Sequence, residues 1–347
     1  MSCFVVIVYI NQFSIRTSNY YNALVSILKE REGATVKVLV IHNIGSGHGA
    51  GAIYDFIRSY AEDGDTITLR TFNGHTPFAT LLEDARDYDF VVASGGDGTI
   101  AAVTYELRYS DIPILPFPSG TANLLAMNLA SPAEPHALAH LMREQRLMDF
   151  DIGEIELSNG ERFGFSMIAG AGYDAAIMEG AEPSKRLLGP MAYFTAAFAN
   201  FAPQFSRITL TIDGKTVETQ GVGVLAINFS KLQFDISLVH ENLPRDGMFD
   251  IVVMNTHDAV GLIPAILSCM LDRAGEFPSR PDAMEVFRCR ECTVVADPPL
   301  AVQYDGEVTG TTTPFTVRML PEAARFVVSE ECLALYGEES ATPLDLD

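Results

Sequence analysis

The chain has 347 residues, of which 48% are hydrophobic and 20% charged, values that fit two folded domains and exclude a largely disordered or collagen-like chain. Asp and Glu number 45 against 23 Lys and Arg, which gives a net charge of −22. This balance disfavours nucleic-acid binding and a polybasic membrane tether, and it leaves apolar contact with a membrane surface open.

The N-terminal part contains no apolar run near the ~20 residues that span a bilayer. The run Phe4–Ile10 is short and lacks the charged segment and cleavage site of a signal peptide, which favours a buried strand. We therefore expect a cytoplasmic protein, with peripheral membrane contact left open. Residues 1–35 form an extension to which the sequence assigns no role.

Between residues 36 and 150, short β-rich runs alternate with helical patterns, which is typical of a parallel sheet with helices on both faces. The expected strands are Val36–His42, Thr66–Thr71, Phe90–Ser94 and Ile112–Pro116. The expected helices are Ala52–Glu62, Pro77–Arg86, Thr99–Arg108, Thr121–Leu129 and Glu134–Gln145. The pattern predicts a three-layer, Rossmann-like α/β domain.

After about Phe150 the pattern changes to short strands separated by turn signals such as Asp213-Gly214 and Asp305-Gly306. This change predicts a β-sandwich over residues 151–330, followed by a C-terminal tail at 331–347. Two helical insertions, Lys185–Phe201 and His257–Leu271, interrupt the strands.

The cysteines do not resemble a disulfide framework, because their number is odd and they are spread along the chain: Cys3, Cys269, Cys289, Cys292 and Cys332. Cys289 and Cys292 form one C-x-x-C without a second pair at zinc-site spacing. Buried thiols are therefore favoured over a metal site.

Three glycine-rich loops follow expected strands. The run Gly95–Thr99 opens a helix after a buried strand, and a turn of this kind directs backbone N–H groups at an anion. Pro118–Asn123 repeats the arrangement one strand later, and Asn43–Gly49 follows the first strand. Because neighbouring parallel strands end at one edge of a sheet, the loops are expected to face one cleft.

No lysine lies between Val38 and Ser184, which excludes a Walker A lysine and the strand lysine of a protein kinase. A nucleotide at these loops would be held by backbone N–H groups, hydroxyls and a metal. Asp97 would repel a phosphate unless Mg²⁺ stood between them or the carboxylate took a substrate proton. The alternative is that Asp97 caps the helix that follows.

These loops resemble the diacylglycerol kinase catalytic-domain family, which includes soluble bacterial lipid kinases and the sphingosine kinases. The resemblance runs from about Val36 to Val328 and rests on Gly95–Thr99, Pro118–Asn123, Gly170–Ala175, Leu188–Tyr193 and Gln303–Glu307. It implies an ATP-binding α/β domain and a β-sandwich that carries the acceptor site, in an NAD-kinase-like arrangement with the nucleotide in the interdomain cleft.

The resemblance also implies roles for individual residues. ATP contacts are expected at Asn43, Ser46, Thr71, Gly95, Gly96, Asp97, Gly98, Thr99, Ser119, Gly120, Thr121 and Asn123. Asp97 would act through Mg²⁺, Asp305 would be the general base with Glu307 close to the same metal or hydroxyl, and Asp174 would lie near the acceptor hydroxyl. Asp305 and Glu307 share one face of a strand at i, i+2, although the residues alone also fit an Asp-Gly turn with a solvated Glu.

The sequence departs from the family pattern at three places. Ile44 follows Asn43 where a proline is usual. A structural Mg²⁺ would use Asp246 and the carbonyl of Met248, but Leu243 stands where the other carboxylate is expected. Residues 229–234 replace a glycine-rich run, which predicts a different acceptor pocket.

The favoured function is a lipid kinase that transfers the γ-phosphoryl group of MgATP to a hydroxyl of a diacylglycerol-like or sphingoid lipid. Its expected partners are that lipid alcohol and, transiently, a membrane surface, without nucleic acid and with a homodimer left open. Lys185–Phe201 would either line an acyl-chain channel or pack in the core, and its helical spacing favours packing.

Two alternative functions stay open. A small-molecule kinase related to the NAD kinases is disfavoured because Phe229 follows Asn228, where an acidic residue would be expected. A nucleotide- or lipid-binding protein without turnover is disfavoured by the retention of Asp97, Asp305 and Glu307.

Overall fold

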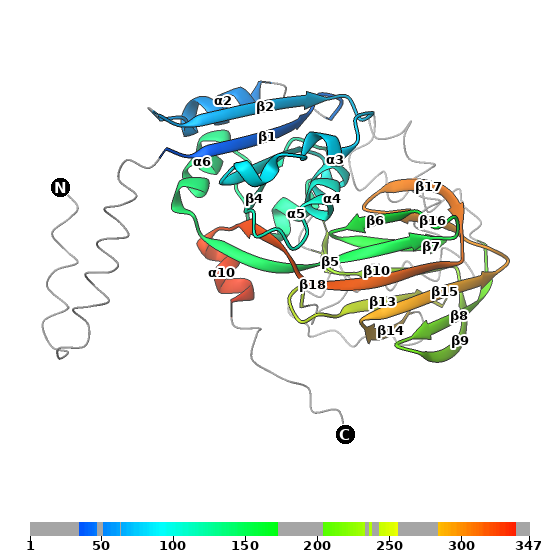
Figure 1. The fold of residues 1–347 in the computed structure, drawn as a ribbon. Coiled ribbons are helices and arrows are strands. Elements are labelled where there is room, and N and C mark those ends of the chain that lie inside the picture. The colour runs from blue at the N-terminus through cyan, green and yellow to red at the C-terminus, as the bar shows by residue number, and fades with distance from the viewer. Residues whose placement is uncertain are drawn as a thin grey trace, which may run out of the picture.

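The computed structural model describes residues 35–46, 51–62, 64–172, 204–232, 236–237, 243–255 and 284–337. They form an α/β part and a β-sandwich, which lie side by side in Figure 1. The expected insertions Lys185–Phe201 and His257–Leu271 lie outside the described residues, as do residues 1–34 and 338–347.

The α/β part alternates strands and helices as expected. Its elements are β1 (Lys37–Asn43), α2 (Ala52–Tyr60), β2 (Thr66–Phe72), α3 (Phe78–Leu81), the 3-10 turn η1 (Ala85–Asp87), β3 (Phe90–Gly95), α4 (Asp97–Glu106), β4 (Ile114–Pro118), α5 (Leu124–Asn128) and α6 (Pro135–Glu144). The strands are parallel in the order β2-β1-β3-β4, and each lies within two residues of its expected position.

The helix expected at Pro77–Arg86 is wrong in extent, because α3 ends at Leu81 and only the short turn η1 follows. Arg70 of β2 donates to the carbonyl of Leu81 at 2.6 Å and forms a bidentate pair with Asp84 at 2.6 Å. These bonds tie the end of α3 to the neighbouring strand. The apolar periodicity of residues 77–86 could not reveal that Arg70 of β2 binds this segment.

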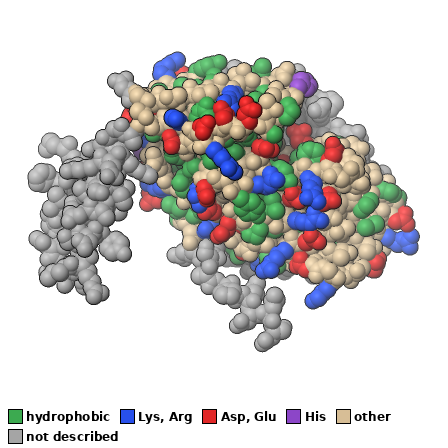
Figure 2. All heavy atoms as spheres, viewed as in Figure 1, with side chains coloured by type: hydrophobic (Ala, Val, Ile, Leu, Met, Phe, Trp, Pro, Cys, Tyr) green, Lys and Arg blue, Asp and Glu red, His purple; other side chains and the backbone are tan. Residues whose placement is uncertain are grey.

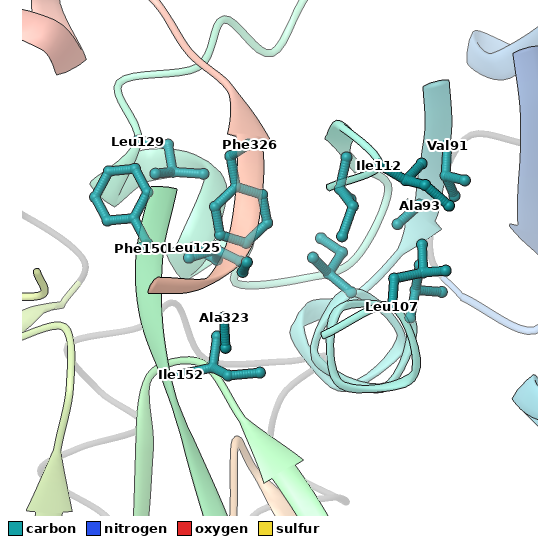
Figure 3. Close-up of a cluster of buried hydrophobic side chains, with 14 of the residues drawn as sticks. Val91, Ala93, Leu107, Ile112, Leu125, Leu129, Phe150, Ile152, Ala323 and Phe326 are labelled. Atoms are coloured by element: carbon teal, nitrogen blue, oxygen red, sulfur yellow. The ribbon is translucent and has the colours of Figure 1, made fainter. Parts of the chain in front are cut away.

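Alternate side chains of the sheet enter two different cores, because successive side chains of a strand point to opposite faces. Val38 and Val40 pack in one cluster with Phe56 of α2 and Leu138 of α6. The opposite face packs against α4, α5 and the C-terminal helix α10 (Glu330–Tyr336), and Figure 3 shows part of that cluster. The expected three-layer arrangement is confirmed.

The sandwich is built from the remaining strands, apart from the separate two-stranded sheet β11-β12. They are β5 (Leu147–Leu157), β6 (Arg162–Phe165), β7 (Ile168–Gly172), β8 (Ser206–Ile212), β9 (Lys215–Gly221), β10 (Gly223–Ile227), β11 (Lys231–Leu232), β12 (Ile236–Ser237), β13 (Phe249–Met254), β14 (Met284–Cys289), β15 (Glu291–Asp297), β16 (Ala301–Tyr304), β17 (Glu307–Thr312) and β18 (Phe315–Val327). One antiparallel sheet has the order β14-β13-β10-β7-β16-β17, and it packs against β5, β6, β18, β15 and β8.

The long strand β18 joins the two parts. It pairs antiparallel with β5 along its length, with an irregularity between Leu320 and Ala324. Its last residues continue into the α/β sheet, where Phe326 is in register with Ile114 of β4. β5 itself runs through the expected domain boundary near residue 150. A continuous two-stranded ribbon therefore connects the sandwich to the sheet that carries the glycine-rich loops (Figure 1).

Helix α10 covers part of the segment expected to be a tail. Ser329 caps it by accepting from the Cys332 N–H at 3.0 Å, and Tyr336 packs edge-on against Phe150 with ring centroids 5.6 Å apart. Cys332 is buried in the same cluster. Cys289 and Cys292 are also buried free thiols, as expected.

Candidate active site at the ends of the parallel strands

The loop after β1 is tied to the loop after β3 through Asn43. The Asn43 Nδ2 donates to Thr99 Oγ1 at 3.0 Å, and its Oδ1 accepts from the Gly45 N–H at 2.9 Å. Asn43 thus holds two predicted nucleotide loops together although Ile44 replaces the usual proline.

The loops after β3 and β4 touch through glycine. A Cβ on Gly120 would lie 2.4 Å from Gly96 Cα, and a Cβ on Gly95 would lie 2.4 Å from Thr99 Cβ. Real Cβ atoms do not approach other heavy atoms so closely, so Gly120 is required for the two loops to meet and Gly95 for the first loop to turn into α4. The predicted convergence of the loops at one sheet edge is what the structure shows.

Asn123 shapes its own loop. Its backbone is left-handed with φ of 52°, and its side chain accepts from the Gly120 N–H at 2.8 Å and donates to the Gly120 carbonyl at 3.0 Å. Thr121, between them, is exposed. α5 therefore begins at Leu124, three residues after the expected start.

Asp97 is the first residue of α4, and its carboxylate caps a different helix. Asp97 Oδ1 accepts from the Leu125 N–H at 3.0 Å, at the beginning of α5, while Gly96 is the N-cap of α4. The alternative that Asp97 caps its own helix is wrong. Burial raises the pKa of Asp97 above its usual value, and the N–H groups near Leu125 oppose that shift.

Asp305 is held by three backbone N–H groups at the corner between β6 and β7. They belong to Ser166, Met167 and Ile168, at 2.6, 2.9 and 2.9 Å. Burial raises the pKa of Asp305 to about 7, against the effect of these donors, and the negative charge of Asp97 adds a small further rise. Asp97 belongs to the α/β part and Asp305 to the sandwich, so this charge effect acts between the two parts of the molecule.

Glu307 reaches the same region from the start of β17. A Cβ on Gly98 would lie 3.0 Å from Glu307 Oε1, so this carboxylate rests against the first turn of α4. The Asp305-Gly306 turn exists, with φ of 42° and 84°, and Glu307 is exposed. The solvated-turn alternative thus describes the local backbone, but both side chains approach the glycine-rich loop.

The comparisons with known proteins agree with this arrangement. A model described as the diacylglycerol kinase catalytic domain matches residues 37–155, and one described as the YegS C-terminal NAD kinase beta sandwich-like domain matches residues 167–328. Each of the two parts of the chain is thus similar to one of these two domains, in the order in which the models match.

Similar proteins include family members of known name. A diacylglycerol kinase of Mycobacterium tuberculosis is 29% identical over 48% of this chain and 55% of its own length. A probable lipid kinase YegS-like of Xanthomonas axonopodis is 25% identical over 71% of this chain and 81% of its own. The chain thus spans little more than half of the M. tuberculosis protein.

The fold has also been seen in a crystal structure. A diacylglycerol kinase from Bacillus anthracis has a TM-score of 0.67 to this chain at 20% identity, covering 86% of this chain and 99% of that one. At this identity the likeness concerns the fold, which is the α/β sheet followed by the antiparallel sandwich.

Further polar residues lie at the ends of the same strands. Thr71 is exposed on β2 and lies in register with His42 of β1. His42 Nδ1 lies 2.9 Å from Ser94 Oγ, and both side chains are buried. Sequence reasoning did not single out His42 or Ser94, although each is a polar residue at the end of an apolar strand. Asp174 lies outside the described residues.

The residues at the expected structural Mg²⁺ site of the family do not fit a metal. Asp246 Oδ1 accepts from the Met248 N–H at 2.9 Å, and its other oxygen pairs with the guanidinium of Arg288. Asp151, nearby, accepts from the Gly247 N–H at 2.6 Å. A guanidinium therefore provides the positive charge expected from the cation, and Asp246 and Met248 serve the turn itself.

We predict that removal of divalent metal leaves the nucleotide-free protein unchanged. Treatment with EDTA, followed by excess MgCl₂, should leave the unfolding temperature the same because Arg288 already neutralises Asp246. Arg288→Leu should lower that temperature, since it leaves a partly buried carboxylate without its partner. A rise in unfolding temperature with Mg²⁺ alone would contradict the first expectation.

At the nucleotide loops, by contrast, the chemistry of the residues fits Mg²⁺ bound together with phosphates. Asp97 and Glu307 offer the oxygen ligands that hard cations prefer. The described part of the chain contains no preformed group of three His, Cys, Asp or Glu that could hold a metal by itself. Phosphate oxygens would supply the remaining ligands.

The raised pKa of Asp305 predicts a pH dependence of stability. The folded group titrates at about 7 and the unfolded group near 3.8, so the folded state binds the extra proton between these values. Its contribution to the free energy of unfolding is therefore lost as pH rises from 4 to 7, at about 1.4 kcal/mol per pKa unit before solvent screening.

Denaturant unfolding at pH 5 and pH 8 measures this effect. The wild type should lose more stability between the two pH values than Asp305→Asn. Asp213→Asn is the matched control, because Asp213 also opens an Asp-Gly turn with φ of 45° and accepts the Glu291 N–H at 2.9 Å. Equal slopes for the wild type and Asp305→Asn would contradict the assignment.

Proposed function

We propose that the protein is an ATP-dependent lipid kinase that transfers the γ-phosphoryl group of MgATP to a hydroxyl of a diacylglycerol-like or sphingoid lipid. The observation that carries the proposal is the contact of Glu307, from the sandwich, with the first turn of α4 at Gly98, while Asp305 stands two residues before Glu307 in the same turn. The names of the relatives support a lipid acceptor.

Asp305 has the acceptor capacity that a general base needs. A carboxylate offers about four lone-pair positions, and three backbone N–H groups occupy three of them. One position is left for a substrate hydroxyl. A pKa of about 7 is suited to proton transfer near neutral pH, because the group is substantially ionised and still a useful base.

The proposed reaction then follows from the positions of the groups. Asp305 accepts the proton of the lipid hydroxyl as the hydroxyl oxygen bonds to the γ-phosphorus, and the bond from that phosphorus to the β-phosphate bridging oxygen breaks. ADP leaves, and Asp305 returns the proton to water. Mg²⁺ bound with the nucleotide would neutralise phosphate charge beside Asp97, while backbone N–H groups and hydroxyls of the loops orient the phosphates.

The lipid would be reached by brief apolar contact with a membrane. Ile44 and Met127, on or next to the nucleotide loops, are 59% and 44% exposed. Acidic and basic side chains are interspersed over the face in Figure 2, and the net charge is −22. Among the described residues, no helix is long and apolar enough to cross a bilayer.

Vesicle sedimentation tests this mode of contact. Because the contact is apolar and salt screens charge repulsion beyond a Debye length of ~8 Å, binding should depend little on the fraction of anionic lipid and should not require it. Binding that requires acidic lipid would contradict it. Ile44→Ser should weaken sedimentation with neutral vesicles, while Val295→Ser, at a sandwich residue of 45% exposure, is the control.

The decisive experiment is transfer of labelled γ-phosphate from MgATP to a total lipid extract in detergent micelles, with separation of the products. A labelled lipid is expected, and its identity names the acceptor. A labelled soluble product would favour a small-molecule kinase. Binding of ATP without any labelled product would favour a nucleotide-binding protein without turnover.

A further inference from the structure

A buried row of polar side chains runs beneath the nucleotide loops. From His42 the row continues through Ser94, whose Oγ lies 3.4 Å from Ser119 Oγ, to Ser46, whose Oγ lies 3.5 Å from Ser119 Oγ. His42 is 3% exposed, Ser94 is fully buried and Ser119 is 8% exposed. The residues come from the ends of β1, β3 and β4 and from the loop after β1.

Counting the available protons identifies the donor and the acceptor of each hydrogen bond in this row. Ser46 Oγ donates its only proton to the Asn43 carbonyl at 2.9 Å, so it can only accept from Ser119. Ser119 therefore donates its hydroxyl proton to Ser46, and it must accept a hydrogen bond from Ser94. Ser94 in turn must accept from His42, which requires the proton of the neutral ring to be on Nδ1.

We infer that His42 is a positioning residue of the nucleotide site, whose Nδ1–H orients the hydroxyls of Ser94 and Ser119 so that Ser119 donates to a nucleotide phosphate. The inference rests on the proposed binding of MgATP at these loops. The contacts of Ser119 with Ser94 and Ser46, at 3.4 and 3.5 Å, are both at the limit of a hydrogen bond, so a phosphate oxygen can replace Ser46 as acceptor. Ser94 continues to donate to Ser119.

The row matters because these loops lack a lysine, which leaves hydroxyls and backbone N–H groups as the phosphate donors. Solvent water cannot take over the hydrogen bond that Ser94 makes to Ser119, because Ser94 is fully buried. A hydroxyl that itself accepts a hydrogen bond is a stronger donor, so the upstream bonds strengthen the bond that Ser119 makes. Burial lowers the pKa of His42, which keeps the ring neutral and its single proton available to define the direction.

The first test needs no nucleotide. Two-bond ¹H–¹⁵N spectra of the full chain, labelled in its histidine rings, should show His42 as the Nδ1–H tautomer at pH 7.5, with its signals assigned by their loss in His42→Asn. The Nε2–H tautomer would overturn the inference, because Ser94 would then donate to His42.

The second test measures nucleotide affinity by calorimetry. His42→Leu and Ser94→Ala should each weaken MgATP binding by roughly 5- to 10-fold, and the double variant should be no weaker than either single variant. His42→Asn should retain most of the affinity, because its amide N–H lies where the ring Nδ1–H was. Adenosine, which has no phosphate, should bind all variants alike.

Thr104→Val is the matched control for deleting a buried hydroxyl. Thr104 is fully buried in α4, and its Oγ1 has no partner in the described part of the chain. Its MgATP affinity should equal that of the wild type. If a variant does not fold, the tautomer measurement on the wild type still tests whether the His42 Nδ1–H donates to Ser94.

The outcomes separate this inference from the function on which it rests. A wild type that binds no MgATP overturns both. A wild type that binds MgATP, with unchanged affinity in His42→Leu and Ser94→Ala, overturns only the positioning role. A loss of adenosine affinity equal to the loss of MgATP affinity would show general damage to the loops and would also overturn it.

Discussion

Asp305→Asn is expected to lower kcat by about 10²- to 10⁴-fold with little change in the KM for MgATP. The amide cannot take the hydroxyl proton, whereas the nucleotide loops are untouched. Transfer of γ-phosphate to micellar diacylglycerol measures both constants. The wild-type kcat should fall below an apparent pKa near 7, as Asp305 becomes protonated.

The variant must be separated from mere damage to the β6–β7 corner, because an amide at Asp305 loses one of its three N–H partners. Asp213→Asn makes the same change at an equivalent turn in the β8–β9 hairpin, where the Asp213 carboxylate accepts from the Arg290 and Glu291 N–H groups. It should lose stability without losing kcat. Normal turnover in Asp305→Asn would show that Asp305 is not the base.

Asp97→Asn is expected to reduce transfer to background, a loss of about 10³-fold or more, while the fold stays intact. The asparagine Oδ1 can still accept the Leu125 N–H that caps α5, and removal of a buried charge relieves its desolvation. What is lost is the negative charge beside the phosphates. Any residual transfer by this variant should depend less on Mg²⁺ than the residual transfer by Asp305→Asn does.

Asp151→Asn is the control for this variant. Asp151 is another buried aspartate of raised pKa that accepts backbone N–H bonds, from Gly247 and Glu322, but it lies at the β5–β18 ribbon. It should alter stability and keep the rate. Appreciable transfer by Asp97→Asn with a normal Mg²⁺ dependence would contradict the proposed role of Asp97.

Local patterns in the sequence were sufficient for much of the architecture. The four parallel strands were predicted because apolar runs and glycine turns are encoded by neighbouring residues. The same local chemistry marked Gly95–Thr99 and Pro118–Asn123 as phosphate loops. Helix extents were less predictable: α3 ends at Leu81, whose carbonyl accepts a hydrogen bond from Arg70 of β2.

The surroundings of the two carboxylates Asp305 and Glu307 could not be predicted from the sequence. The D-G-E motif named Asp305 and Glu307, but the three N–H groups that hold Asp305 come from Ser166 to Ile168, far away in the chain. Its pKa near 7 follows from that burial and could not be read from the motif. The sequence also could not show that Arg288, from the distant strand β14, pairs with Asp246 where a cation was expected.

The order of strands and turns and the positions of the glycine-rich loops could be predicted from the sequence, because they depend on residue type and short-range spacing. The lack of a phosphate-binding lysine in these loops was evident in the same way. Three features depend on the three-dimensional fold: β18 returns to β4, Glu307 lies against Gly98 of α4, and His42 Nδ1 lies within hydrogen-bond distance of Ser94 Oγ. Those contacts join residues many positions apart, and they form only when burial of the cores brings distant strands into register.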